Sequence, residues 1–191
     1  MSVGYSNTTW EQVKDYFPIV GENLGTASNG GLRGELLTAL HKYLCYQNTC
    51  FGSIMDGNEA KRVHFIVPII IIVCAYFEGQ IEIRAQEKVE GNRVHAHAHF
   101  EFLLKRSNKR ICIVEAKKDG ISLGKAQSLF GSEALCDIEN LSVTYAIVTN
   151  FMEWCFLKNE PDKVIEDIMM IAYENCEPTL ESVRARVQFF S

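Results

Sequence analysis

Apolar side chains recur every three or four positions between residues 32 and 45, which is the spacing of a helix with one buried face. The positions that carry this pattern are Leu32, Leu36, Leu37, Leu40, Tyr43 and Leu44. Closer to the N-terminus, Thr8 and Glu11 have the spacing of a helix-capping pair. They predict a short helix over residues 8–17.

The longest apolar run covers residues 65–77, with the sequence FIVPIIIIVCAYF. Its β-branched residues favour a strand, whereas its length and the position of Pro68 favour a helix. The run has 13 residues, and a membrane span needs about 20. We therefore expect a core helix. The segments before it predict a loop over 21–31 and an irregular connection over 46–60.

From residue 80 onwards the pattern changes to alternation, in which every second residue is apolar, as in strands. The alternation is strongest over 95–105. A polar turn over 106–109 then leads to the apolar stretch 111–117, so these two stretches predict a β-hairpin. The remaining predicted elements are a strand over 81–89, a helix over 123–137, strands over 143–149 and 154–157, and helices over 161–174 and 180–189.

This order of elements predicts an α/β fold with a mixed central sheet flanked by helices. A chain of 191 residues fits one domain with a sizeable core. We expect a single domain over 1–191, made of an N-terminal annex (1–30), a core (31–160) and C-terminal helices (161–191).

The composition narrows the classes of protein that the chain could be. Hydrophobic residues make up 47% and charged residues 23%, as in soluble globular domains. The formal net charge of −5 excludes binding of nucleic acid through bulk positive charge, but not through a local basic patch. Seven cysteines without a C-x-x-C pair favour a reducing compartment, and residues 1–10 do not form a secretory signal. We expect an intracellular protein, in the cytoplasm or nucleus, that does not enter a membrane.

The strand over 111–117 ends in Glu115, Ala116 and Lys117. Because side chains alternate along a strand, Glu115 and Lys117 lie on one face. This pattern suits the hydrolysis of phosphate esters: the carboxylate would hold a divalent metal and the ammonium would lie near the attacked phosphate. The alternative is that the strand emerges into solvent here, since Lys118 follows.

The preceding strand adds a second carboxylate, Glu101. In a regular hairpin register Glu101 lies beside Glu115. Two adjacent carboxylates repel each other unless a cation lies between them. Mg²⁺ and Mn²⁺ prefer oxygen ligands, so the pair predicts a site for one of these ions.

Three histidines, His95, His97 and His99, share the predicted strand face of Glu101. Such a pattern could bind zinc. However, Glu101 follows too closely for a cupin, and the aspartate of the metallo-β-lactamase pattern is absent. The alternative is that the imidazoles are sheet-face residues or line the cleft near phosphate, where His99 is the nearest to Glu101.

Three further polar residues are candidates for supporting roles. Gln127 and Lys125 lie early in the helix that follows Lys117, which places them over the open end of the sheet. An amide there can hydrogen-bond phosphate or water, and the ammonium can add positive charge. Glu35 lies beside the leucine stripe of the first long helix and could face the same cleft. For each of them, an exposed position without a role is the alternative.

Taken in order, these segments resemble the PD-(D/E)xK nuclease superfamily, and in particular the nuclease-like domains of crinkler-type proteins of oomycetes and fungi. The resemblance covers about residues 31–160 and implies a restriction-endonuclease-like core. It rests on the helix with Glu35, the strand with Glu101, ICIVEAKK over 111–118, the pair Ala126-Gln127, and TYAIVTNFMEWCFLK over 144–158.

The resemblance implies a role for each matching residue. Glu101, Glu115 and the carbonyl oxygen of Ala116 would bind the metal, and Lys117 would position or activate the attacking water. Supporting roles would fall to Glu35 and Gln127. The chain departs from the pattern in one place, where Phe100-Glu101 replaces the usual Pro-Asp. Glutamate is one methylene longer than aspartate, so the metal or the strand must shift.

The function implied is that of a Mg²⁺- or Mn²⁺-dependent endonuclease, with DNA favoured over RNA, in the cytoplasm or nucleus of a host cell. Two alternatives stay open: a catalytically weak effector or binding module that contacts host nucleic acid or protein, and an RNA-directed nuclease in which a histidine joins the acidic cluster. The sequence also leaves a homodimer open. A basic rim could be formed by Lys105, Arg106, Lys109, Arg110, Lys117, Lys118 and Lys125.

Overall fold

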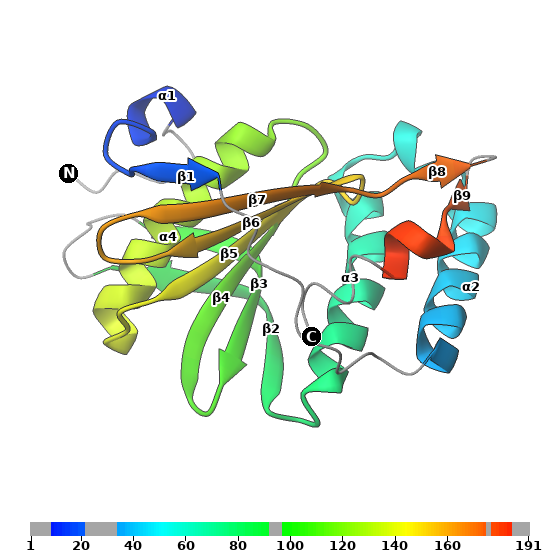
Figure 1. Cartoon of the computed structure of the whole chain (residues 1–191), viewed down its shortest axis with the longest axis horizontal. Helices are drawn as coiled ribbons and strands as arrows, with labels where there is room; N and C mark the ends of the chain where they lie inside the picture. Colours follow the sequence, from blue (N-terminus) through cyan, green and yellow to red (C-terminus); the bar gives the residue numbers. More distant parts are fainter. Residues whose placement is uncertain (1–8, 22–33, 92–96, 175–176, 185–191) are drawn as a thin grey trace.

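The computed structural model describes residues 9–21, 34–91, 97–174 and 177–184. It confirms an α/β fold with a mixed seven-stranded sheet, in the order β1-β7-β6-β5-β4-β3-β2 (Figure 1). The strands are β1 (Ile19–Gly21), β2 (Ile81–Glu90), β3 (His97–Arg106), β4 (Lys109–Ala116), β5 (Thr144–Thr149), β6 (Glu153–Asn159) and β7 (Val164–Met170). The helices are α1 (Trp10–Val13), α2 (Gly34–Phe51), the 3₁₀ helix η2 (Ile54–Asp56), α3 (Glu59–Tyr76) and α4 (Ile121–Glu139).

One side of the sheet, from the edge strand β2 inwards, is an antiparallel meander followed by a parallel crossover. Strands β2, β3 and β4 pair antiparallel, and β3 and β4 form the predicted hairpin. The chain then crosses through α4 and returns as β5, parallel to β4. The hairpin turns at Ser107 and Asn108, which both have positive φ.

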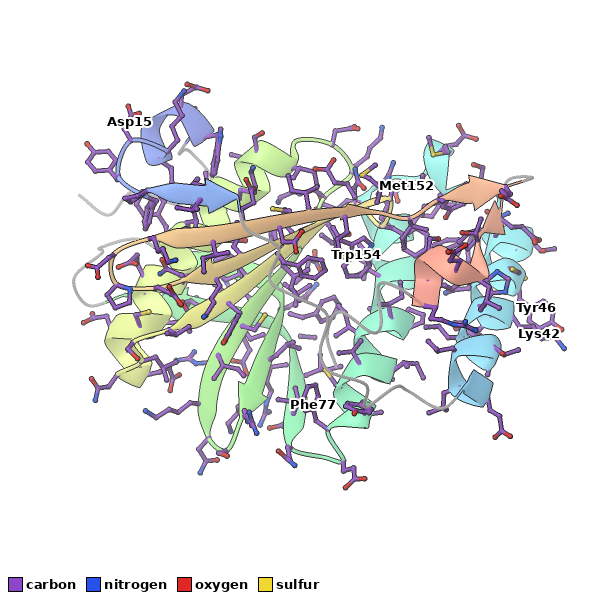
Figure 2. The ribbon with its side chains drawn as sticks, viewed as in Figure 1. Asp15, Lys42, Tyr46, Phe77, Met152 and Trp154 are labelled. Atoms are coloured by element: carbon purple, nitrogen blue, oxygen red, sulfur yellow. The ribbon has the colours of Figure 1, made fainter. Side chains whose placement is uncertain are left out.

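Helices cover the sheet on both faces, and the alternation along β4 shows which core each side chain joins. Ile113 packs with Ala126 and Leu129 of α4. Its neighbour Val114 belongs to the other core, with Phe65 and other residues of α3. Helix α2 packs on the far side of α3, away from the sheet (Figure 1). Its outer face carries Lys42 and Tyr46, which point away from the sheet (Figure 2).

Strand β3 does not alternate regularly, in contrast to the sequence prediction. Phe100 lies in the core beneath α4, whereas Phe102 lies in the core beneath α3. Both residues pair with β2, but the intervening Glu101 lies opposite Gln86, whose φ is +52°. The strand therefore twists at Glu101, and this twist decides which face its neighbours occupy.

We expect Gly131→Ala to destabilise the protein. A Cβ at this position of α4 would lie 2.4 Å from Cζ of Phe100 and 2.6 Å from Cδ1 of Ile113. Overpacking of this kind costs about 1–3 kcal/mol. Gly34→Ala is the matched control, since its Cβ would meet no atom of the described residues within 4 Å. Urea unfolding would measure both, and equal stability of the two variants would contradict this account of the α4 contact.

The apolar run over 65–77 forms most of α3, as predicted. The helix begins after Asn58, whose side chain accepts a hydrogen bond from the Lys61 backbone N–H. Pro68 lies inside the helix. None of the helices in the described ranges is long and apolar enough to cross a bilayer.

The predicted helix over 161–174 is wrong, because the segment forms β7. After β6, the chain turns at Pro161 and Asp162 and pairs back antiparallel, so that Val164 lies opposite Asn159. Proline followed by aspartate is a turn signal, and β-pairing with β6 outweighs the helical spacing of the apolar residues. Strand β6 corresponds to the strand predicted over 154–157, whereas β7 and β1 were not predicted as strands and widen the sheet to seven strands.

Other boundaries also differ from the prediction. Helix α2 runs to Phe51, so the connection over 46–60 is much shorter than expected. The helix predicted over 8–17 is reduced to α1. A two-stranded sheet, β8 (Tyr173–Glu174) with β9 (Glu177–Pro178), precedes a helix that begins at Leu180. The predicted loop over 21–31 lies almost entirely outside the described residues.

Candidate functional site

The geometry of the candidate site is set by Glu115 and Lys117 at the end of β4. The ammonium Nζ of Lys117 lies 2.6 Å from Oε1 of Glu115. The Glu115 side chain is 8% exposed and that of Lys117 is 15% exposed. The second oxygen of Glu115, Oε2, is buried and has no hydrogen-bond partner among the described residues. A buried carboxylate oxygen without a partner is costly in an otherwise satisfied core.

Lys117 is held in this position by α4, which crosses directly above it. A Cβ on Gly124 would lie 3.2 Å from Cγ of Lys117 and 2.6 Å from Cγ1 of Val148. Only glycine allows this close approach. On the other side, the Lys117 backbone N–H donates to the carbonyl of Thr149 at the end of β5. The lysine therefore belongs to the sheet and does not emerge into solvent.

Glu101 lies at the same end of the sheet and is half-buried. Burial raises its pKa above the ordinary value, with a further rise from the charge of Glu59, while Lys117 acts in the opposite direction. Burial also raises the pKa of Glu115, against the charge and hydrogen bond of Lys117 and the backbone of Glu101. The structure thus brings Glu101, Glu115 and Lys117 together, as the sequence predicted.

Glu59 is a member of this group that the sequence analysis missed. It is the first residue of α3, and its charge acts on Glu101. The available signal was the sequence Asn58-Glu59 before the apolar run, which is typical of a helix start. Because residues 46–60 were predicted to be an irregular connection, Glu59 was not recognised as the first residue of a helix.

The carbonyl of Ala116 points toward β3. Hydrogen-bonding groups of successive residues in a strand point to opposite sides, and the N–H of Lys117 points to β5. The last pair of residues in the β3–β4 ladder is Phe102 with Val114, so the ladder stops one residue short of Glu101. The Ala116 carbonyl therefore faces the end of the β3–β4 ladder.

The structure does not bring Glu35 to this group. Glu35 is exposed in the first turn of α2. It is the other end of α2 that approaches the start of α3, where the ring of Phe51 stacks on His64 at a centroid distance of 5.0 Å. Sixteen residues separate Glu35 from Phe51, which is about 24 Å of helix.

Lys125 has a different environment from the one predicted. Its ammonium lies 2.6 Å from Oε1 of Glu166 on β7 and 4.2 Å from the ring centroid of Trp10. Strand β7 is three strands away from β4. Lys125 therefore connects α4 to β7 and α1.

The remaining candidates are Gln127 and the histidines. Gln127 is half-buried on α4, one turn after Gly124, and so lies on the side of the helix nearest to Lys117. His99 is exposed and pairs with Lys88 of β2. His95 and the side chain of His97 lie outside the described residues. Within the described ranges, no three His, Cys, Asp or Glu side chains are arranged to hold a metal.

The turn after β5 supports the end of β4. Arg62 of α3 donates from Nη1 to the carbonyl of Asn150 at 2.6 Å. Within the turn, Thr149 Oγ1 donates to the carbonyl of Glu153, and Trp154 Nε1 donates to the carbonyl of Phe151. These bonds fix the strand that receives the Lys117 backbone N–H.

The raised pKa values give a stability prediction with a defined sign. A carboxyl group whose pKa is higher in the folded than in the unfolded state stabilises the protein while it is protonated. This stabilisation is complete below the ordinary pKa of 4.5 and is lost as the pH rises through the raised pKa of the folded state. In EDTA, the unfolding free energy of the wild type should fall relative to that of Glu101→Gln as the pH rises from about 4.5 to neutrality. Urea titrations at several pH values would measure this, and parallel pH profiles would contradict it.

A comparison with known proteins adds one relative. The chain is 43% identical over 153 residues to Crinkler effector protein 5 of Phytophthora infestans, an alignment that covers 80% of this chain and 44% of the relative. No family model and no solved structure matches. The chain spans less than half the length of this relative. The similarity supports the resemblance to crinkler-type proteins that the sequence indicated.

Proposed function

We propose that this chain is a metal-dependent nuclease that hydrolyses phosphodiester bonds, with DNA favoured over RNA. The observation that carries the proposal is the convergence of Glu101 of β3 with Glu115 and Lys117 at the end of β4, where the buried Oε2 of Glu115 has no hydrogen-bond partner among the described residues. We also propose a PD-(D/E)xK, restriction-endonuclease-like core. The segments on which the resemblance rests are α2, β3, β4, α4 and the pair β5–β6, in this order along the chain.

The carboxylates of Glu101 and Glu115 are suited to binding a divalent cation. Two adjacent carboxylates with raised pKa values, one of them with an unpartnered oxygen, are stabilised by a cation that supplies the missing contact. Glu101, Glu115 and the carbonyl of Ala116 would hold Mg²⁺ or Mn²⁺. When bound, the ion would polarise the scissile phosphate and make a bound water more acidic.

The chain's own residues supply the rest of the chemistry. The Lys117 ammonium is fixed by Glu115, and its aliphatic chain by Gly124, so it can hold the attacking water and donate to a phosphate oxygen as negative charge develops. Glu59 adds a third negative charge near Glu101. This charge attracts a cation and repels a phosphate that arrives without one, which makes cleavage depend on the metal.

Plasmid nicking tests the proposal. Supercoiled DNA should be nicked by the wild type in Mg²⁺ or Mn²⁺, and EDTA should abolish the reaction. A single-stranded RNA substrate under the same conditions would establish the preference for DNA. No cleavage of either nucleic acid with any divalent metal would overturn the proposal.

The second candidate is a nuclease-fold effector or binding module without turnover, acting on nucleic acid or protein inside a host cell. One observation favours it: the Glu115–Lys117 ion pair already neutralises the central carboxylate. Binding of DNA that is independent of divalent metal and is not followed by cleavage would support this candidate instead.

A further inference from the structure

We propose that a groove at the opposite end of the sheet from Glu115 binds an amphiphilic carboxylate with a long apolar tail. The groove has a volume of about 460 Å³, within the range of small-molecule sites. It lies where β4 begins, whereas Glu115 lies where β4 ends. The proposal is independent of the nuclease chemistry.

The walls of the groove are almost entirely apolar. One wall is the end of α3, with Val73, Cys74 and Phe77; Phe77 is labelled in Figure 2 at the lower end of this helix. The other wall is the α3-facing side of the sheet. Its apolar members are Ile81, Leu104, Ile111, Cys112, Tyr145, Ile147 and Phe156. Ala146 and Leu157 also border the groove, although their side chains belong to the core beneath α4. Tyr145 is 43% exposed, so part of this wall faces solvent.

The charged side chains that line the groove are both cations. They are Arg106 of β3 and Lys158 of β6, and none of the described residues that line the groove is Asp or Glu. Lys158 is paired with Glu160 at 2.6 Å. Arg106, by contrast, donates to the neutral amide oxygen of Gln80, so its charge is not neutralised by that contact. The chain as a whole has a net charge of −5, so the positive charge of this rim differs in sign from that of the protein as a whole.

This chemistry selects one class of ligand. A nucleobase in the groove would leave its polar edge largely unpaired, and burying polar groups without hydrogen bonds is unfavourable. A peptide would need partners for its backbone, but β3, β4, β5 and β6 each already have two neighbouring strands. An unbranched aliphatic chain has no such requirement. Its carboxylate would lie at the rim, on Arg106.

The test compares three ligands with the same tail on the full chain. Isothermal titration below the micelle concentration would use dodecanoate, dodecanol and dodecyltrimethylammonium. We expect dodecanoate to bind most tightly and the cation least. Arg106→Gln should weaken dodecanoate binding about fivefold, the upper range for an exposed ion pair, and leave dodecanol binding unchanged. Lys109→Gln, on the same hairpin but outside the groove, is the matched control and should bind as the wild type does.

A second measurement locates the ligand. Cys74 lines the groove, and burial raises the pKa of its thiol to about 11. Dodecanoate should slow the alkylation of Cys74, followed by peptide mass spectrometry, and leave that of the exposed Cys50 unchanged. Equal affinity for all three ligands, no effect of Arg106→Gln, or equal protection of Cys50 would each overturn the proposal. So would the absence of binding, which would mean that the groove is covered by another segment or another copy of the chain.

Discussion

Replacing Lys117 with alanine should abolish plasmid cleavage while leaving Mn²⁺ binding within several-fold of the wild type. The ammonium lies 2.6 Å from Glu115 and the aliphatic part of the side chain packs beneath Gly124, so the ammonium is oriented before substrate arrives. Its interaction grows as negative charge develops on the phosphate, and the loss of one oriented donor costs about 10²–10³ in rate. Glu101 and Glu115 remain, so the cation should still bind.

Lys118→Ala is the matched control, because this neighbouring lysine is exposed. It should cleave as the wild type does. Metal binding would be followed by the rise in melting temperature with Mn²⁺, and folding by circular dichroism. If Lys117→Ala cleaves as fast as the wild type, the lysine has no part in the chemistry. If it neither cleaves nor binds Mn²⁺, its role is to hold Glu115 in place.

Lys125→Ala should cause one of the largest losses of stability, without a direct effect on the site at Glu115. The Lys125 and Glu166 side chains are 11% and 16% exposed, and the same Glu166 oxygen also accepts from the Cys155 thiol at 3.1 Å. Removal of the lysine leaves a buried carboxylate without its cation, and removes the contact with the Trp10 ring. Breaking a buried pair in this way costs about 3–5 kcal/mol.

The double variant Lys125→Met, Glu166→Leu distinguishes loss of the pair from loss of packing. It removes both charges and keeps the volume, so it should recover most of the stability. Urea unfolding of the two single variants and the double variant completes the cycle. Additive losses would show that Lys125 and Glu166 do not stabilise each other. Near-wild-type stability of Lys125→Ala would show that the pair does not stabilise the fold.

The hairpin and the segment that follows it could be predicted because their signals are local. The alternation of residues 95–105 in the sequence and the polar turn after it define the hairpin, although β3 changes face at Glu101. Glu115 and Lys117 share a face because β4 alternates. Helix α3 was also correctly predicted from its length. In each of these cases the structure follows from the residues of the segment itself.

The errors arose where pairing with distant residues decides the structure. The apolar spacing of β7 fits a helix, and only the turn at Pro161 and the partner strand β6 make it a strand. Glu59 could not be identified from the sequence as a residue of the candidate site, because its closeness to Glu101 depends on how α3 lies across the sheet. Lys125 was placed near the site by its sequence position, but the helical period turns it toward Glu166 on β7.

The position of β1 at the edge of the sheet has a consequence for the order in which the protein folds. Ile19 pairs with Val164, so the first strand of the chain can join the sheet only after the last long strand has formed. The meander of β2, β3 and β4 and the crossover to β5 close short loops, and contacts close in sequence form early. The segment with α1 and β1 should therefore fold last. Its amides should exchange with solvent through local opening, well before those at the centre of the sheet.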